Sequence, residues 1–343
     1  MSVIISPVST SLPEFLAQKK YSKIFVLADT NTKKHCYPAL KKILPKHHTL
    51  VVSAGETHKN LATCTQIWAA MTEVSLDRHA LVVNLGGGVI GDMGGFCGAT
   101  YKRGIDFIQI PTTLLAQVDA SVGGKLGIDF EGFKNHIGVF AQPQSVLIDQ
   151  SFLATLPYVE LRSGFAEVIK HCLIADAAKW DEIRTKDLQQ QNWHDLIAHS
   201  VEIKQKIVGQ DPTEQGLRKI LNFGHSIGHA LETYLLNQPT RRILHGEAVA
   251  AGMVMEAYVA FRKKMIDAQT LDQIEEFIFS VFGRVEITDT EFDTILALAH
   301  QDKKNKDGQL RFSLLNQHVG HCVWDVEVSA SEFIKALKYY RGQ

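Results

Sequence analysis

This 343-residue sequence has no long hydrophobic run, no excess of charge of either sign and few cysteines. No run approaches the ~20 apolar residues of a membrane-spanning helix, so we expect no membrane insertion. Lys and Arg total 36 and Asp and Glu total 37, for a formal net charge of -1. Such a balance offers no overall field to attract nucleic acid or an acidic membrane surface, so neither is an expected partner.

The cysteines are scattered and show no CxxC spacing. An odd number of them argues against a disulfide framework and a zinc knuckle, and favours reduced thiols in a cytoplasmic protein. The segment from Met1 to Pro7 lacks the basic region and the apolar stretch of a signal peptide, which favours the same location. The cysteines are Cys36, Cys64, Cys97, Cys172 and Cys322.

Short apolar runs rich in β-branched residues recur through the first part of the chain, separated by segments of helical length. Strands buried on both faces of a parallel sheet have this near-continuous apolarity. We therefore predict an α/β fold with parallel strands at 23–28, 50–53, 80–85, 107–110 and 145–148. The first four runs end in polar or turn-forming residues, and ligands bind beyond such carboxyl ends in open parallel sheets.

After residue 150 the pattern changes to long segments with helical periodicity, which continue from about Leu161 to His300. Two short strand-like runs follow at 309–315 and 321–326. Ser329 and Glu332 then have capping-box spacing before a last helix from Phe333 to Tyr340. A chain of this length suits two cores better than one. The sequence predicts an N-terminal parallel-sheet domain at 1–150 and a mostly α-helical domain at 151–343.

A glycine-rich turn, Gly86-Gly87-Gly88-Val89-Ile90-Gly91-Asp92, follows the third of these predicted strands. Glycines let backbone N–H groups approach a phosphate, and the start of the next helix adds partial positive charge. The letters fit GxGxxG, which is a weak match alone, because glycine also serves tight packing. Asp29, Thr112 and Thr113 at other strand ends favour a cofactor site, with Asp29 on a ribose hydroxyl and the threonines on phosphate or amide groups.

Polar residues interrupt an apolar segment at 217–235, which we predict to be a single helix. Arg218, Asn222, His225 and His229 are spaced 4, 3 and 4 and would share one face of that helix. Asparagine and histidine are costly choices for a solvated helix and natural ones for a binding site.

Two further segments offer partners for these histidines. Glu167 and Lys170 lie three residues apart among apolar neighbours, and His245 lies at the start of another apolar helix. Glu167, His225 and His245 would form a two-histidine, one-carboxylate site with an open position for substrate or water. The alternative is a pair of core histidines and an ordinary Glu–Lys helix pair.

Basic residues and glycines gather in a predicted loop after the fourth of these strands. Gly124-Lys125 and Lys134-Asn135 suit an anion, because N–H groups and ammonium groups share its charge. Arg103 adds a guanidinium that suits a carboxylate or a phosphate. Lysines in exposed loops usually serve only solubility, so this prediction depends on the combination with the metal site.

Several collinear blocks carry a resemblance to one family. They are GGGVIGDMGGF from Gly86, YKRG from Tyr101, PTTLLAQVDASVGGK from Pro111, KNHIG from Lys134, SGFAEVIKH from Ser163, LNFGHSIGHALE from Leu221 and HGEAVAAGM from His245, with DKK at 302–304. In these blocks the chain resembles the 3-dehydroquinate synthases of the sugar-phosphate cyclase superfamily. The resemblance implies an NAD-binding α/β domain, a helical domain that binds zinc or cobalt, and a homodimer.

The resemblance also implies roles for individual residues. The metal ligands would be Glu167, His225 and His245, the set reached above. NAD would be bound by Asp29, Glu56, Lys59, Gly86, Gly87, Gly88, Gly91, Asp92, Thr112, Thr113, Asp119, Lys125 and Lys134. Substrate binding and catalysis would fall to Arg103, Lys125, Lys134, Asn135, Lys170, Lys204, Arg218, Asn222, His229 and one of Lys303 and Lys304.

The implied reaction converts 3-deoxy-D-arabino-heptulosonate 7-phosphate, a small anionic sugar phosphate, into 3-dehydroquinate and phosphate in the shikimate pathway. The metal acidifies a substrate hydroxyl, NAD takes hydride transiently, phosphate leaves, the hydride returns, and the ring opens and recloses by an aldol step. Lys125, Lys204 and Arg218 would neutralise substrate charge, while His229 and Asn222 would orient groups or relay protons.

Three alternatives remain at this stage. Another sugar-phosphate cyclase would act on sedoheptulose 7-phosphate or glucose 6-phosphate, but His229 and the Lys134-Asn135 pair favour dehydroquinate synthase. A metal-dependent polyol or alcohol dehydrogenase would need fewer basic residues, and an inactive NAD-binding regulator would not need the metal ligands. Leu126 stands where the family usually has threonine and Phe133 where it has glycine, which affects local packing.

Overall fold

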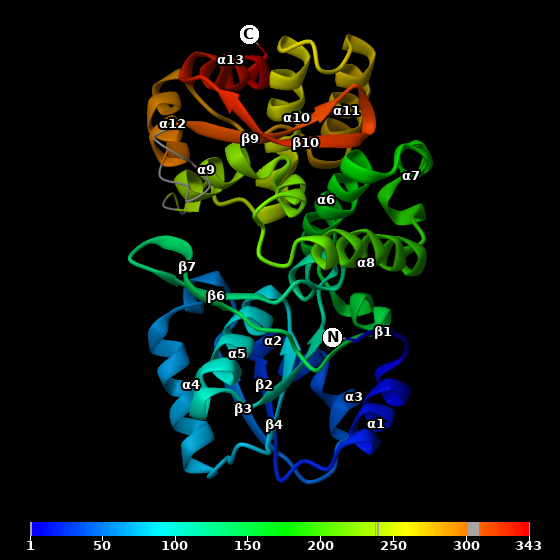
Figure 1. Cartoon of the computed structure of the whole chain (residues 1–343), viewed down its shortest axis with the longest axis vertical. Coiled ribbons are helices and arrows are strands. Elements are labelled where there is room, and N and C mark those ends of the chain that lie inside the picture. Colours follow the sequence, from blue (N-terminus) through cyan, green and yellow to red (C-terminus); the bar gives the residue numbers. More distant parts are fainter. Residues whose placement is uncertain (1, 237, 239, 301–308, 343) are drawn as a thin grey trace. The chain divides into compact units, whose positions relative to one another are not determined.

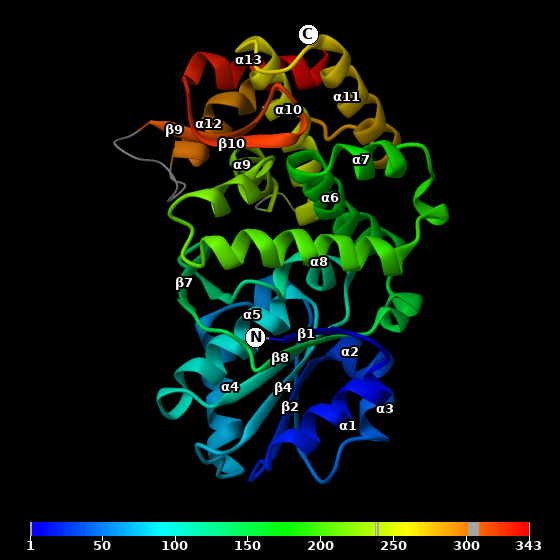
Figure 2. The same ribbon diagram turned by 45° about the vertical axis from the view of Figure 1, so that its right-hand side comes forward.

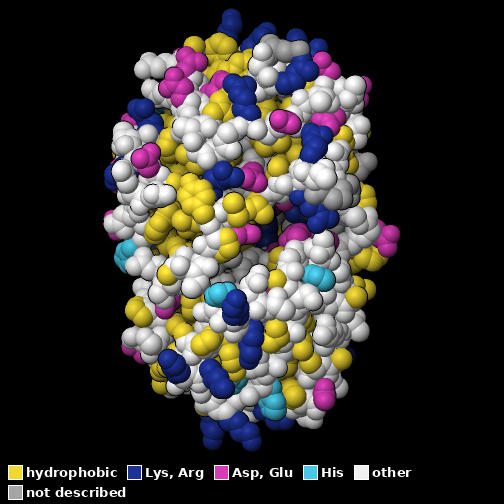
Figure 3. All heavy atoms as spheres, turned by 180° about the vertical axis from the view of Figure 1, so that it is seen from behind, with side chains coloured by type: hydrophobic (Ala, Val, Ile, Leu, Met, Phe, Trp, Pro, Cys, Tyr) yellow, Lys and Arg dark blue, Asp and Glu magenta, His cyan; other side chains and the backbone are white. Residues whose placement is uncertain are grey.

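The computed structural model describes residues 2–236, 238, 240–300 and 309–342. These residues form two compact units, Met1–Leu161 and Arg162–Gln343, each with its own core (Figure 1). Acidic, basic and hydrophobic side chains all occur on the face drawn in Figure 3. Among the described residues, no helix combines the length and the apolar character that crossing a membrane requires.

Unit 1 is built on a six-stranded sheet in the order β1-β8-β5-β4-β2-β3, in which every neighbouring pair is parallel. The predicted α/β fold is confirmed, and the sheet contains each strand expected from the apolar runs. The additional edge strand β1 was not predicted. The bounds are β1 Ser2–Ile5, β2 Ile24–Asp29, β3 His48–Val52, β4 Leu81–Gly86, β5 Asp106–Pro111 and β8 Ser145–Ile148.

Helices cover both faces of this sheet (Figures 1 and 2). Side chains that alternate along β2 enter different cores: Phe25 and Leu27 pack with α4 and α5, whereas Ile24 and Val26 pack with α1 and α3. This double burial explains the continuous apolarity of the strand sequences. The helices are α1 Val8–Gln18, α2 Thr30–His35, α3 Tyr37–Lys41, α4 Leu61–Glu73 and α5 Gly88–Thr100, with short turns η1 Glu56–His58, η2 Tyr101–Arg103, η3 Ala116–Ala120 and η4 Gln150–Thr155.

The glycines of α5 let it lie directly on the sheet. A Cβ atom at Gly94 would lie 2.1 Å from the Oδ1 atom of Asn84 in β4, and one at Gly95 would lie 2.6 Å from Leu126. Glycine weakens a helix by about 1 kcal/mol relative to alanine. The glycines are nevertheless present in α5 because they allow its backbone to approach β4 closely. This contact places the start of α5 just beyond the end of β4.

The segment predicted as a basic loop is in fact a β-hairpin. Its strands, β6 Lys125–Phe130 and β7 Phe133–Phe140, pair antiparallel, with a register irregularity between Ile128 and Phe130. Leu126 and Ile128 are buried against the α4–α5 side of the core. Glycine and lysine composition suggested a loop, but these two apolar side chains on one face are enough to anchor a strand.

Unit 2 is mostly α-helical, as predicted, and includes one antiparallel strand pair, β9–β10. The capping box expected at Ser329 and Glu332 is present at the start of the last helix. The bounds are α6 Tyr158–Ala175, α7 Ala177–Ile183, η5 Leu188–Gln190, α8 Trp193–Gln210, η6 Leu217–Asn222, α9 His225–Leu236, α10 His245–Arg262, α11 Ala268–Phe282, η7 Asp289–Glu291, α12 Phe292–His300, β9 Leu310–Asn316, β10 His318–Val328 and α13 Ala330–Arg341.

The prediction of one helix at 217–235 is wrong. The chain forms the short helix η6, turns at Gly224 with φ of +79°, and then begins α9 at His225. A left-handed conformation at that position ends any continuous helix. Arg218 and Asn222 therefore do not share a helical face with His225 and His229.

All five cysteines are buried free thiols. Burial raises the pKa of Cys36 to about 12, and it also raises the pKa values of Cys97, Cys172 and Cys322. At pH 8 a thiol of pKa about 12 is ionised in only about one molecule in ten thousand, and the thiolate is the reactive form.

We therefore expect the folded protein to react negligibly with a disulfide reagent at pH 8. After unfolding in urea, all five thiols should react rapidly, consuming five equivalents of the reagent. Rapid labelling of the folded chain would contradict this.

Candidate active site

Three helices of unit 2 bring the predicted metal ligands together. Glu167 lies in the buried middle of α6, and His225 and His245 are the first residues of α9 and α10. The Oε1 atom of Glu167 lies 3.3 Å from Nε2 of His225 and 3.4 Å from Nε2 of His245. These three ligand atoms therefore face one another from separate elements.

The spacing of these atoms fits a shared divalent ion. Two ligands bound to zinc at ~2.0–2.1 Å with a tetrahedral angle are about 3.3–3.4 Å apart. The buried Oε1 atom of Glu167 accepts no well-formed hydrogen bond from the described residues. A carboxylate oxygen in that position, facing two imidazole nitrogens, is the donor set expected of an open zinc or cobalt site.

The other ring nitrogens of the two histidines are fixed by acceptors. Nδ1 of His225 lies 3.1 Å from the carbonyl oxygen of Phe223, and Nδ1 of His245 lies 3.1 Å from Oε2 of Glu232. Because a carbonyl or a carboxylate accepts, Nδ1 donates in each case and Nε2 is left for a metal. Glu232 was missed by the sequence analysis, although it lies seven residues after His225 and so falls on the same side of α9.

Charges around the cluster favour a carboxylate anion at Glu167. Burial opposes its ionisation, but the adjacent Lys170 ammonium favours the anion, and the pKa of Glu167 lies well below its usual range. Burial lowers the pKa of His225 to about 3, so that ring is neutral. Burial also disfavours the charged form of His245, but Glu232 and Glu167 outweigh it and raise its pKa to about 10, so an ion at Nε2 would replace a proton.

His229 lies beside the same cluster. Its ring centroid is 5.0 Å from that of His225 and 5.6 Å from that of His245. Potential ligand atoms of the three histidines lie within 4.8 Å of one another. The geometry thus offers a second ligand set, in which His229 takes the place of Glu167.

The other predicted residues of unit 2 are buried or held by hydrogen bonds. The ammonium of Lys170 contacts Glu167, three residues earlier on α6. Lys204 on α8 is buried, and so is Arg218, whose guanidinium donates to the carbonyl oxygen of Pro212 at 2.5 Å. Asn222 donates to Oε1 of Glu214 at 2.8 Å. Lys303 and Lys304 lie outside the described residues.

In unit 1 the predicted NAD residues follow four neighbouring strands at one edge of the sheet. Asp29 ends β2, Glu56 and Lys59 follow β3, the glycine turn follows β4, and Thr112 and Thr113 follow β5, with Asp119 in η3. Gly87 precedes α5 without a side-chain cap, which leaves backbone N–H groups at the helix start for an anion. One oxygen of Asp29 already caps α2 by accepting from Asn31 and Thr32.

A buried lysine links these residues to the hairpin. Nζ of Lys59 donates to Oδ2 of Asp92 in α5 and to Oδ1 of Asn135 in β7, each at 2.6 Å. Lys134 lies 3.4 Å from Glu56. Burial disfavours the charged form of Lys59, but Asp92 and Glu56 outweigh it and raise its pKa, so the ammonium stays charged.

Lys59→Met is expected to lower the free energy of unfolding by about 3 kcal/mol, because it removes the buried ammonium that donates to Asp92 and Asn135. The matched control is Lys19→Met, which breaks another Lys–Asp pair of 2.6 Å. The Lys19 side chain is 56% exposed and that of Lys59 is 4% exposed, so the control should cost less than about 1 kcal/mol. Urea denaturation measures both, and equal losses would contradict the structural account.

Arg103 lies apart from the other predicted residues of unit 1. It belongs to η2, between the end of α5 and the start of β5. It therefore lies at the amino ends of the parallel strands, whereas the glycine turn lies at their carboxyl ends. Its φ of +67° and the φ of +49° at Asn135 are left-handed conformations, which are uncommon for residues other than glycine.

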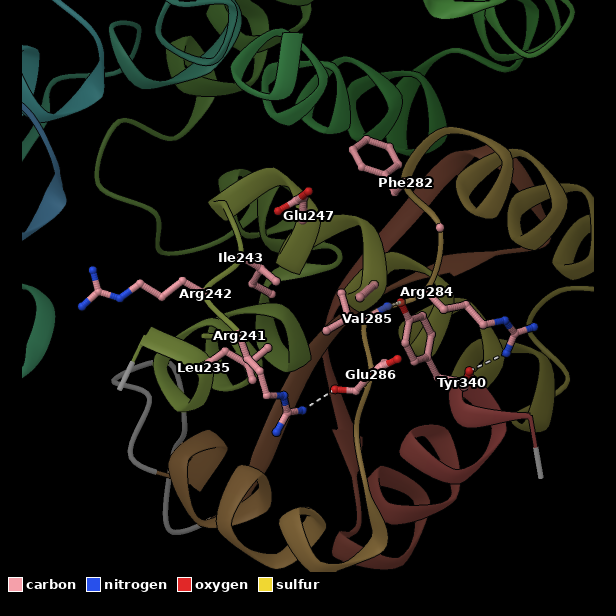
Figure 4. Close-up of a pocket in the computed structure, with 12 residues that line it drawn as sticks. Leu235, Arg241, Arg242, Ile243, Glu247, Phe282, Arg284, Val285, Glu286 and Tyr340 are labelled. Carbon is pink, nitrogen blue, oxygen red and sulfur yellow. Dashed lines mark hydrogen bonds between the residues drawn. The ribbon is translucent and has the colours of Figure 1, made fainter. Parts of the chain in front are cut away.

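A surface pocket of about 270 Å³ opens elsewhere on unit 2 (Figure 4). Its lining includes Glu247 and Ala251 of α10 but none of the three metal ligands. Arg241 and Arg284 at this pocket donate to the carbonyl oxygens of Glu286 and Tyr340. The guanidinium groups that border it are thus bound to the protein, and the metal cluster is the stronger candidate for chemistry.

Comparisons with known proteins identify relatives along almost the whole chain. A model of the N-terminal part of 3-dehydroquinate synthase matches residues 49–163, and one of the C-terminal part matches residues 164–305. The 3-dehydroquinate synthase of Parabacteroides distasonis is 43% identical over 344 residues, covering 99% of this chain and 97% of the relative.

Solved structures of related enzymes share the fold. The 2-epi-5-epi-valiolone synthase of Streptomyces hygroscopicus subsp. jinggangensis, with NAD+ and Zn2+ bound, is 26% identical, with a TM-score of 0.87 over 99% of this chain and 96% of that one. For a 2-deoxy-scyllo-inosose synthase complexed with carbaglucose-6-phosphate, NAD+ and Co2+, the identity is 22% and the TM-score 0.84, over 99% and 96%. Both halves of the sequence match one family and a relative matches end to end, so this chain belongs to the 3-dehydroquinate synthase family.

Proposed function

We propose that this chain is a 3-dehydroquinate synthase that binds NAD and zinc or cobalt. It converts 3-deoxy-D-arabino-heptulosonate 7-phosphate into 3-dehydroquinate and phosphate. The observation that carries the proposal is the convergence of Glu167, His225 and His245 at ligand spacing in a member of this family. The likeness to a 3-dehydroquinate synthase, at 43% identity, exceeds the 26% identity to the valiolone synthase and favours this cyclase over that one.

The proposed cofactors divide between the units. Unit 1 binds NAD at the carboxyl ends of β2, β3, β4 and β5, through the predicted residues that lie there, and unit 2 binds the metal. A bound metal acidifies a substrate hydroxyl, and bound NAD accepts a hydride and later returns it. The backbone N–H groups at the start of α5 bind and orient a phosphate group of the dinucleotide.

The basic side chains of each unit bind the anionic groups of the substrate. Lys125, Lys134 and Asn135 contribute from unit 1, and Arg103 is retained in the set on the family resemblance alone. Lys170, Lys204 and Arg218 contribute from unit 2, with one of Lys303 and Lys304. His229 and Asn222 hold or move protons, and His229 is suited to this because its ring lies beside those of the two metal ligands.

The experiment is a coupled product assay on the purified, chelator-stripped protein. The heptulosonate phosphate, a catalytic amount of NAD and zinc are added, and phosphate and dehydroquinate are measured together. We expect equal amounts of the two products, many turnovers per NAD and no turnover without metal. Stoichiometric NADH without phosphate would instead indicate a dehydrogenase, and activity on sedoheptulose 7-phosphate alone would indicate another cyclase.

We also propose that the enzyme is a cytoplasmic homodimer. The five free cysteines support a reducing compartment, and the family resemblance supports the dimer. Light scattering coupled to size-exclusion chromatography tests the dimer directly, and a mass equal to one chain would contradict it.

A further inference from the structure

Glu256 is a buried carboxylate that has no part in the proposed chemistry. It lies on α10, its residue is fully buried, and it was not among the predicted site residues. Its two oxygens accept hydrogen bonds from separate backbone groups: Oε2 from the N–H of Gly224 at 2.7 Å and Oε1 from the N–H of Ile227 at 3.0 Å. These two groups flank His225, the first residue of α9.

The start of α9 needs such an acceptor. The first N–H groups of a helix have no partner within it, and the residue before α9 is Gly224, which has no side chain to cap them. Glycine is required there, because φ is +79° and a Cβ atom would lie 2.5 Å from Met253. The carboxylate of Glu256 therefore caps α9 from the neighbouring helix and places a negative charge at its positive end.

The packing of α9 on α10 brings this carboxylate within reach. A Cβ atom at Gly252 would lie 1.9 Å from the carbonyl oxygen of Gly224, so the two backbones touch at this point. Glu256 lies one helical turn after Gly252, on the same side of α10. His245 is eleven residues before Glu256, which again is close to a whole number of turns.

We propose that Glu256 is a positioning residue for the metal ligand His225. Its two hydrogen bonds hold the first turn of α9 at a set distance from α10, and so fix the His225 ring relative to His245. The arrangement is reciprocal: Glu232 of α9 orients His245 on α10, and Glu256 of α10 anchors the helix start that carries His225. This inference rests on the proposed metal site and adds a residue of this chain to it.

The test measures cobalt binding by the folded protein rather than turnover. Co2+ is titrated into metal-free wild type and Glu256→Gln, and the affinity and the visible ligand-field spectrum are recorded. In the variant an amide group faces two N–H donors and can accept well from only one. We expect cobalt affinity to fall by about 10- to 100-fold, the usual effect of losing an outer contact of a metal site, with a changed spectrum. Glu256→Asp keeps the charge but shortens the side chain. Its cobalt affinity should lie between those of wild type and Glu256→Gln.

Glu291→Gln is the matched control. Glu291 is also buried, accepts a backbone hydrogen bond from Thr288 at 2.8 Å and caps the helical turn η7, but that turn carries no metal ligand. Glu291→Gln should lower the midpoint temperature of thermal unfolding without changing the cobalt affinity or the spectrum. If folded Glu256→Gln and Glu256→Asp bind cobalt within twofold of wild type with the same spectrum, Glu256 is only structural and the inference is overturned. Failure of wild type itself to bind cobalt would overturn the proposed metal site as well.

Discussion

Glu167→Gln is expected to lower zinc or cobalt affinity by more than about 100-fold, beyond the loss usual for an outer contact. Product formation should fall by about a thousandfold, which corresponds to ~4 kcal/mol of lost transition-state stabilisation. The glutamine keeps the size of the side chain and removes only its charge. The change therefore separates the role of the carboxylate from its packing in α6.

The expected size of the effect follows from the burial of the site. Glu167 is 0% exposed and Lys170 is 1% exposed, so water cannot replace the lost carboxylate. The variant also removes the charge that balances the Lys170 ammonium, and loss of one partner of a buried pair costs about 3–5 kcal/mol of stability. Glu182→Gln is the control, because Glu182 has the same three-residue spacing to Lys179 but is 45% exposed. Glu182→Gln should leave metal binding unchanged and lower the free energy of unfolding by at most about 1 kcal/mol.

His229→Gln decides between the two ligand sets at this cluster. If Glu167 is the third ligand, His229→Gln should retain metal affinity and reduce turnover. If the three histidines bind the metal instead, His229→Gln loses the metal and Glu167→Gln retains it. Calorimetric titration of zinc into both metal-free variants distinguishes these outcomes, and the second outcome would refute the proposed set.

In unit 1, the sequence predicted the features that depend on residues adjacent in the chain. Buried parallel strands such as β4 are continuous apolar runs, and the turn at Gly86 follows its strand directly, so both were found. The edge strand β1 was not, because four residues at the end of a chain carry too little pattern. The hairpin of Lys125 and Phe133 was mistaken for a loop, since its glycines and lysines outnumber the apolar residues that anchor it.

In the metal cluster, residue type was more informative than spacing. Glu167 and His245 were found because a carboxylate and a histidine are unusual in apolar helices. The single helix proposed through Arg218 and His229 was wrong, because its periodicity runs unbroken through Gly224 in the sequence while the chain turns there. Contact with α10, which lies about thirty residues further along, stabilises that turn. Glu256 was missed for the same reason: its role depends on where α9 begins.

Gly252→Ala is expected to lower the free energy of unfolding of unit 2 by more than about 3 kcal/mol, above the usual cost of overpacking a core. The added Cβ atom would lie 1.9 Å from the carbonyl oxygen of Gly224, 2.9 Å from its carbonyl carbon and 2.9 Å from the nitrogen of Gly228. All three are backbone atoms of the start of α9, so no side chain can rotate away to make room. The helices must separate, and the cap from Glu256 lengthens with them.

Gly209→Ala provides the control within the same unit. Gly209 lies in α8, and a Cβ atom there would meet nothing within 4 Å, so alanine should stabilise the helix by about 0.5–1 kcal/mol. Urea unfolding of the metal-free proteins, followed by tryptophan fluorescence, reports mainly on unit 2, because Trp180, Trp193 and Trp324 lie there and only Trp68 lies in unit 1. Gly252→Ala should also weaken cobalt binding, because His225 moves with the start of α9. A variant as stable as wild type would show that the two helices can separate at little cost, and that their close contact does not hold the metal ligands in place.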